Sequence, residues 1–165
     1  MSILIIALPR TGSTSLLYKI AKEKNLKPLF EPFDKTNRVQ YSNEKDIVVK
    51  TIICHHPNNL ELSKEFDDVI LLSRKNLKEC AESHAYQTHF SKTKNYHSNN
   101  PYVYEETPKD VFELCYNDIL KWTDDIEKLS LQLNVPILYY EDLFNPSGDG
   151  RLRIADRGNL TKKLI

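Results

Sequence analysis

A short aliphatic run near the amino end of the chain leads directly into a polar loop and then into a helical pattern. Residues 3–8 are apolar without interruption, which is typical of a strand buried on both faces of a parallel sheet. Apolar side chains then recur at helical spacing over residues 13–24. The loop between the two patterns holds Gly12, the only glycine before Gly148. Because glycine tolerates left-handed backbone and the close approach of a ligand, we expect this loop to be a binding element.

The alternation of apolar strands with helices continues along the chain. The further strands predicted are residues 47–53, 69–73 and 136–140, and the further helices are 58–66, 76–90 and a long helix that begins at Pro108 with Thr107 as its N-cap. Strands joined by helices form right-handed βαβ units, which build a mostly parallel sheet. We therefore predict an α/β fold with three layers, in which helices cover both faces of a mostly parallel central sheet.

The long helix carries an apolar stripe, and the segments around it complete the domain. The stripe is typical of a helix that packs on a core, and we favour this interpretation over a seam for a partner protein. Residues 91–104 show no period and are predicted to be a loop. Residues 1–147 are predicted to form one domain, followed by a basic tail over 148–165 that either closes over an anionic ligand or is a solvated terminus. The members of the stripe are Phe112, Cys115, Ile119, Trp122, Ile126, Leu129 and Leu133.

Charge and composition exclude several classes of partner. The chain has 165 residues, and its 23 Lys and Arg balance its 23 Asp and Glu, so the formal net charge is zero. A nucleic-acid clamp or a polybasic membrane binder needs a strong positive field, which this balance does not supply. The three cysteines do not form the pattern of a disulfide framework or a zinc site, and the apolar amino end is too short to span a bilayer. We therefore expect a cytoplasmic protein with no membrane span and no nucleic-acid partner.

The loop after the first strand has the composition of an anion cradle. Backbone N–H groups of a tight loop, together with the N-terminus of the following helix, form a nest for a negative group. Arg10 adds a fork of donors suited to phosphate or sulfate. In the loop of nucleoside triphosphatases a Lys stands where this chain has Ser13, so a divergent nucleotide kinase is the least favoured interpretation. The loop residues are Pro9, Arg10, Thr11, Gly12, Ser13 and Thr14.

Four stretches, in order along the chain, resemble the sulfotransferase family, most closely its carbohydrate-directed branch. Residues 9–14 after the aliphatic strand resemble the family's 5′-phosphosulfate loop, and residues 29–33, Leu-Phe-Glu-Pro-Phe, resemble a Glu-Pro segment that follows the first helix. Arg74 at a strand end and Ser83 on the next helix resemble the family's 3′-phosphate site. Residues 139–143, Tyr-Tyr-Glu-Asp-Leu, resemble a Tyr-Glu-Asp-Leu segment after a late strand. The resemblance implies a P-loop-like fold.

The resemblance also implies a reaction, in which 3′-phosphoadenosine-5′-phosphosulfate (PAPS) donates a sulfuryl group to an acceptor hydroxyl or amine without a metal. Arg10 and the loop amides would hold the 5′-phosphate and its developing charge. Arg74 and Ser83 would bind the 3′-phosphate. The family's basic residue and Ser are usually eight residues apart, a spacing that Lys75 has and Arg74 does not, so Lys75 is the alternative ligand.

The general base is the role with the most candidates. The cytosolic branch places a His shortly after a Lys-Thr pair at a strand end, but Lys50-Thr51 is not followed by that His here. Glu31, in the Glu-Pro segment, is the first candidate, and His55 and His56 are the second. The acceptor is expected to be a small molecule or a carbohydrate. The main alternative is a catalytically inactive relative that binds PAPS or its product as a binding module, because the chain is shorter than most catalytic members.

Overall fold

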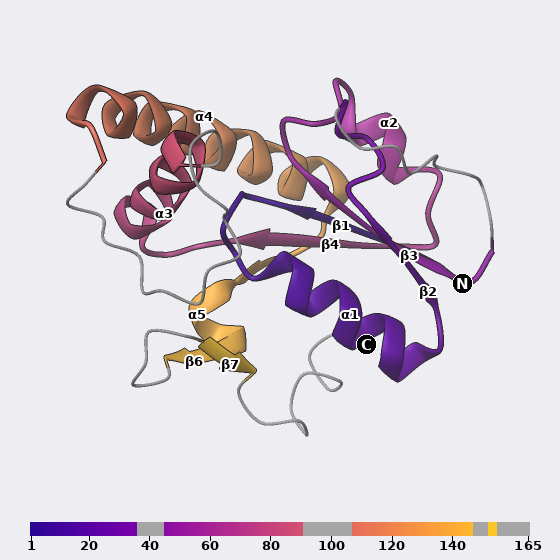
Figure 1. Ribbon diagram of the computed structural model, residues 1–165. Coiled ribbons are helices and arrows are strands. Elements are labelled where there is room, and N and C mark those ends of the chain that lie inside the picture. Colours follow the sequence, from indigo (N-terminus) through magenta and orange to yellow (C-terminus); the bar gives the residue numbers. More distant parts are fainter. Residues whose placement is uncertain (36–44, 91–106, 147–151, 155–165) are drawn as a thin grey trace.

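A computed structural model of the chain describes residues 1–35, 45–90, 107–146 and 152–154. Its central sheet has five parallel strands in the order β2-β3-β1-β4-β5 (Figure 1). The predicted α/β fold with a mostly parallel sheet is confirmed, and every pairing within this sheet is parallel. The strands are β1 (Ser2–Ala7), β2 (Lys27–Phe30), β3 (Ile47–Ile52), β4 (Asp68–Ser73) and β5 (Ile137–Tyr139).

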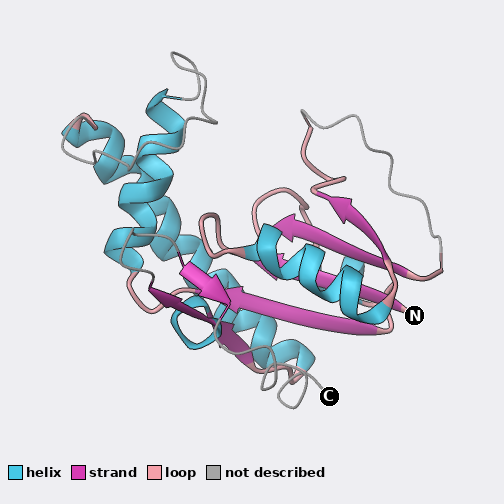
Figure 2. Cartoon of the chain, turned by 60° about the horizontal axis from the view of Figure 1, so that its bottom comes forward, coloured by secondary structure: helices cyan, strands magenta, loops and turns pink. Residues whose placement is uncertain are grey.

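Helices cover both faces of the sheet. Helix α1 (Ser13–Lys24) packs on one face against Ile3 and Ile5 of β1, and it lies in front of the strands in Figure 2. Leu4 and Ile6 of the same strand point to the opposite face. That face is covered by α2 (Asn59–Ser63) and α4 (Lys109–Leu133), with α3 (Leu77–Phe90) packed beside α4. A strand between two helical layers has to be apolar at every position, which explains the unbroken aliphatic run of β1.

The apolar stripe of α4 faces the core, as predicted. Four of its residues are buried, and the other three are partly buried and pack against the core clusters. The buried members are Cys115, Ile119, Ile126 and Leu129. In the part of the chain that the structure describes, no helix is long and apolar enough to cross a membrane.

The amino end of α4 differs from the prediction. The helix begins at Lys109, and Pro108 is its N-cap, with no side chain capping the first turn. The prediction that Thr107 is the N-cap is therefore wrong, and its buried hydroxyl has no hydrogen-bond partner within the described ranges. Pro108 has φ −55 and ψ 141, an extended conformation in which it cannot be the first helical residue, so the helix starts one position later.

Three strands and one short helix of the structure were not predicted from the sequence. Strand β2 contains Lys27 and Pro28, two residue types that are rare in strands. Helix α5 (Tyr140–Leu143) begins where the last predicted strand was expected to end. Strands β6 (Phe144–Pro146) and β7 (Leu152–Ile154) form an antiparallel pair. Strand β7 lies within the predicted tail, while the rest of that tail and the predicted loop 91–104 lie outside the described residues.

Candidate functional site

The loop between β1 and α1 places two residues in left-handed backbone. Arg10 has φ 61 and Gly12 has φ 70, and Gly12 is the N-cap of α1. Thr11 between them is buried, and its hydroxyl donates a hydrogen bond to the Leu8 carbonyl over 2.8 Å. In the part of the chain that the structure describes, no side chain caps α1, and the first turn of α1 contains no acidic residue. The amino end of α1 therefore keeps the donors and the partial positive charge that an anion requires.

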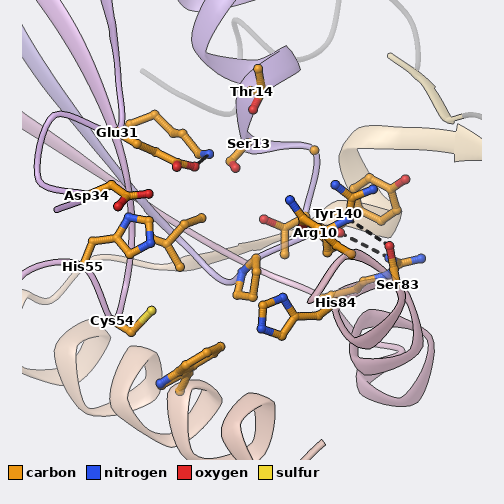
Figure 3. Close-up of a pocket in the computed structure, with 18 of the residues that line it drawn as sticks. Arg10, Ser13, Thr14, Glu31, Asp34, Cys54, His55, Ser83, His84 and Tyr140 are labelled. Carbon is orange, nitrogen blue, oxygen red and sulfur yellow. Dashed lines mark hydrogen bonds and ion pairs between the residues drawn. The ribbon is translucent and has the colours of Figure 1, made fainter. Parts of the chain in front are cut away.

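A cavity of about 720 Å³ lies at the carboxyl ends of the strands, the place where open α/β sheets bind ligands. Residues that follow each of the five strands line it, so side chains distant in sequence converge there (Figure 3). Two predicted site residues, Lys75 and His56, do not line this cavity. The predicted site residues that do line it are Pro9, Arg10, Thr11, Gly12, Ser13, Thr14, Glu31, His55, Arg74 and Ser83.

Arg10 and its loop are held against α3. Arg10 Nε donates a hydrogen bond to Ser83 Oγ over 2.9 Å, and the Ser83 side chain is buried. Arg74 Nη1 donates to the Arg10 carbonyl over 3.2 Å, and Cys80 Sγ donates to the Pro9 carbonyl over 3.2 Å. These three contacts hold the first residues of the left-handed turn, Pro9 and Arg10, in place. The guanidinium of Arg10 is therefore positioned at the cavity before any ligand enters.

Arg74 reaches the cavity wall, but its guanidinium already has partners. Its Nη2 lies 2.6 Å from Glu79 Oε1, and its Nε lies 3.7 Å from Glu141 Oε1, an ion pair too long to be a hydrogen bond. The guanidinium also lies over the ring of Tyr140, 4.5 Å from its centroid. A phosphate that binds Arg74 would have to compete with the Glu79 carboxylate.

Lys75 and His56, the two predicted site residues outside the cavity, make contacts elsewhere on the surface. Lys75 Nζ lies 2.5 Å from Asp142 Oδ1, and this hydrogen bond raises the pKa of Lys75. The His56 ring packs edge-on against Phe33, with 5.2 Å between the centroids. His56 lines a separate hollow of about 480 Å³ beside α4. Arg74 is therefore better placed than Lys75, and His55 better placed than His56, for a role in the cavity.

Lys50 lines the cavity although it was not predicted as a site residue. It belongs to β3, is only 3% exposed, and forms an ion pair with Glu31. Its ammonium also lies 4.4 Å from the centroid of the Phe30 ring. Burial lowers the pKa of Lys50, whereas the hydrogen bond to Glu31 acts in the opposite direction. The signal that could have identified it is a lone charged residue within an otherwise uncharged and buried strand.

Glu31, Asp34 and His55 gather next to Lys50 because two turns meet at adjacent strand ends. The Glu31 N–H donates to the Lys50 carbonyl over 2.8 Å, and the Asp34 N–H donates to the Glu31 carbonyl over 3.1 Å. The His55 N–H donates to the Ile52 carbonyl over 2.9 Å, which closes the turn after β3. One potential ligand atom from each of the three side chains lies within 4.8 Å of the other two. Two of the base candidates, Glu31 and His55, therefore share one wall of the cavity.

Helices α3 and α4 supply a wall with less charge. His84 and Trp122 line it, and their rings meet edge to face, with 5.7 Å between the centroids. Burial lowers the pKa of His84, which favours the neutral imidazole. Its Nδ1 is buried, and no described residue forms a hydrogen bond with it. An aromatic face beside a neutral imidazole suits an uncharged polar group. Neither His84 nor Trp122 was predicted to belong to the site, and Trp122 was assigned to the core stripe of the long helix.

Comparison of the chain with protein-family models, with curated proteins and with solved structures finds no match. The resemblance of the sequence to sulfotransferases therefore stays a prediction. The geometry of the cavity is the basis on which a function can be proposed.

Proposed function

We propose that the chain is a sulfotransferase that moves a sulfuryl group from PAPS to an acceptor hydroxyl or amine without a metal ion. The observation that carries the proposal is that the uncapped amino end of α1, the Arg10 guanidinium and the Lys50–Glu31 pair line one cavity. Sulfuryl transfer needs positive groups for the leaving phosphate and a base for the acceptor proton. Both kinds of group lie here within one space large enough for two small reactants.

In the proposed reaction, Arg10 and the first-turn N–H groups of α1 bind the 5′-phosphate of the donor. The acceptor oxygen or nitrogen forms a bond to sulfur, and the bond between sulfur and the bridging phosphate oxygen breaks. That oxygen keeps the electron pair, and its negative charge is stabilised by Arg10 and Lys50. The acceptor proton passes to Glu31. Because Lys50 and Glu31 pair with each other in the structure, the two reactants would separate them on binding.

The 3′-phosphate of the donor is assigned to Arg74 and Ser83. The Ser83 hydroxyl accepts a hydrogen bond from Arg10, and its own hydrogen can be donated to a phosphate oxygen. Arg74 would exchange the Glu79 carboxylate for the phosphate. This contact would distinguish the donor from ATP, which has no 3′-phosphate.

Thermal unfolding with nucleotides tests the donor. We expect 3′,5′-diphosphoadenosine (PAP), the product of PAPS, to stabilise the chain by about 2.7 kcal/mol at a hundredfold excess over its Kd. ATP with Mg²⁺ should stabilise it much less, because Ser13 stands where triphosphatases use Lys. Preference for ATP with Mg²⁺ would contradict the proposal and favour a nucleotide kinase.

The variant Glu31→Gln tests the base, with PAP release measured over a panel of carbohydrate and small-molecule acceptors. We expect it to lose transfer and keep PAP binding, whereas the control Glu61→Gln, which alters an exposed side chain of α2, keeps both. An active Glu31→Gln would move the role of base to His55.

A second candidate function is an inactive PAPS-binding module, favoured by the ion pair in which Glu31 and Lys50 occupy each other. PAP binding without any transfer by the unaltered chain would support that module.

A further inference from the structure

The wall formed by Glu31, Asp34 and His55 combines two carboxylates and one imidazole. Figure 3 shows these three side chains grouped on one side of the cavity, with Arg10, Ser83 and Tyr140 on the other. The three come from two turns whose backbone hydrogen bonds fix them at the ends of the adjacent parallel strands β2 and β3. Their nearest oxygen and nitrogen atoms lie within 4.8 Å of one another.

His55 supplies a second observation that indicates a ligand. Its Nδ1 is buried and has no hydrogen-bond partner among the described residues, an arrangement that is unfavourable unless something else binds there. Glu31 pairs with Lys50 through Oε1, but a carboxylate has two oxygens and can serve a cation and an ammonium at the same time. All three side chains are partly exposed, so they can adjust their positions when an ion enters.

We propose that Glu31, Asp34 and His55 form a binding site for one divalent transition-metal ion of the Mn²⁺ or Zn²⁺ type. Ligand atoms around such an ion are about 3.4 Å apart at bond lengths of about 2.1 Å, so the cluster has to contract by up to about 1.4 Å. One imidazole with two carboxylates suits Mn²⁺, Fe²⁺ or Zn²⁺ better than Mg²⁺ or Ca²⁺, which prefer oxygen ligands throughout. Three protein ligands leave a coordination position that faces the cavity.

The ion would also compete with the reaction proposed above. A metal ion on Glu31 occupies the carboxylate that is assigned to the acceptor proton. Added Mn²⁺ or Zn²⁺ is therefore expected to inhibit transfer, and a chelator is expected to restore it. This consequence rests on the proposed function, whereas the ion site itself does not.

Titration of the metal-free chain with Mn²⁺, followed by the electron paramagnetic resonance signal of the free ion, tests the site directly. We expect one Mn²⁺ per chain, displaced by Zn²⁺ and unaffected by an excess of Mg²⁺. The variants Asp34→Asn and His55→Ala should each weaken binding at least about tenfold. The control His56→Ala removes the neighbouring imidazole, which lies outside the cavity, and should bind like the unaltered chain.

Three results would overturn the site: no saturable binding, displacement by Mg²⁺ as readily as by Zn²⁺, or equal effects of His55→Ala and His56→Ala. Circular dichroism of the metal-free variants shows whether each one is folded. PAP stabilisation is measured in parallel on the unaltered chain and on Asp34→Asn. Both should be stabilised, because Asp34 has no part in the proposed transfer. If the unaltered chain fails to bind PAP but Asp34→Asn still loses Mn²⁺, the proposed function fails and the ion site stands.

Discussion

Replacing Arg10 by glycine and, separately, by alanine should distinguish strain in the loop from the function of the guanidinium. Arg10 has φ 61, a region where a residue with a Cβ atom is less stable than glycine by about 1 kcal/mol. Both variants lose the 2.9 Å hydrogen bond to Ser83, which destabilises each by about 1.5 kcal/mol. The difference between them therefore isolates the backbone, and Arg10→Gly should be more stable than Arg10→Ala by about 1 kcal/mol.

Thermal unfolding in the absence of ligand measures this difference, which corresponds to about 2–4 °C in Tm for a chain of this size. The same two variants should both lose stabilisation by PAP, because both lack the guanidinium. Arg10→Lys keeps the charge without the fork of donors and should retain part of the PAP effect. If Arg10→Ala is as stable as Arg10→Gly, the loop is not strained at this position. If Arg10→Gly still responds to PAP like the unaltered chain, Arg10 does not bind the anion.

Two further predictions concern the walls of the cavity. Glu79→Gln removes the carboxylate that occupies Arg74, and it should tighten PAP binding up to about fivefold while leaving AMP unchanged, since only PAP has a 3′-phosphate. Equal changes for PAP and AMP in a calorimetric titration would rule out Arg74 as the 3′-phosphate ligand. Because burial lowers the pKa of His84 from 6.5, the unfolded chain takes up this proton first as the pH falls, so stability is lost below pH 6.5. Urea unfolding at pH 7 and pH 5 should show that loss of stability in the unaltered chain and a smaller loss in His84→Gln. If the difference in unfolding free energy between the two chains is the same at both pH values, the prediction is contradicted.

The sequence identified the elements whose signals are local. The aliphatic run of β1, the helical spacing of α1 and the lone Gly12 between them predict a strand, a tight loop and a helix, and the structure has all three. Each of these signals lies within a few neighbouring residues. The order of the parallel strands then places the ends of β1 and β4 side by side, which brings Arg10 to Ser83.

The features that were not predicted depend on contacts between distant residues. Lys50 reads as one more position of a buried strand, and only its pairing with Glu31 shows why a charge is tolerated there. Arg74 reads as an unoccupied phosphate ligand, because the sequence pattern shows neither its close ion pair with Glu79 nor the longer one with Glu141 of the remote helix α5. The N-cap of α4 is a local exception. Thr107 was expected there because Thr followed by Pro is a common helix start, but the extended backbone of Pro108 makes Pro108 itself the N-cap.

Strand β2 stands at one border of the five-stranded sheet, and its sequence blocks association there. The N–H groups of Lys27 and Glu31 donate toward the neighbouring strand, so the nitrogen of Pro28 points away from the sheet. Proline has no hydrogen to offer at that point, and the charged Lys27 beside it is exposed, two devices that discourage a second chain from extending the sheet. Strand β2, which places Glu31 at the cavity, thus also disfavours edge-to-edge aggregation.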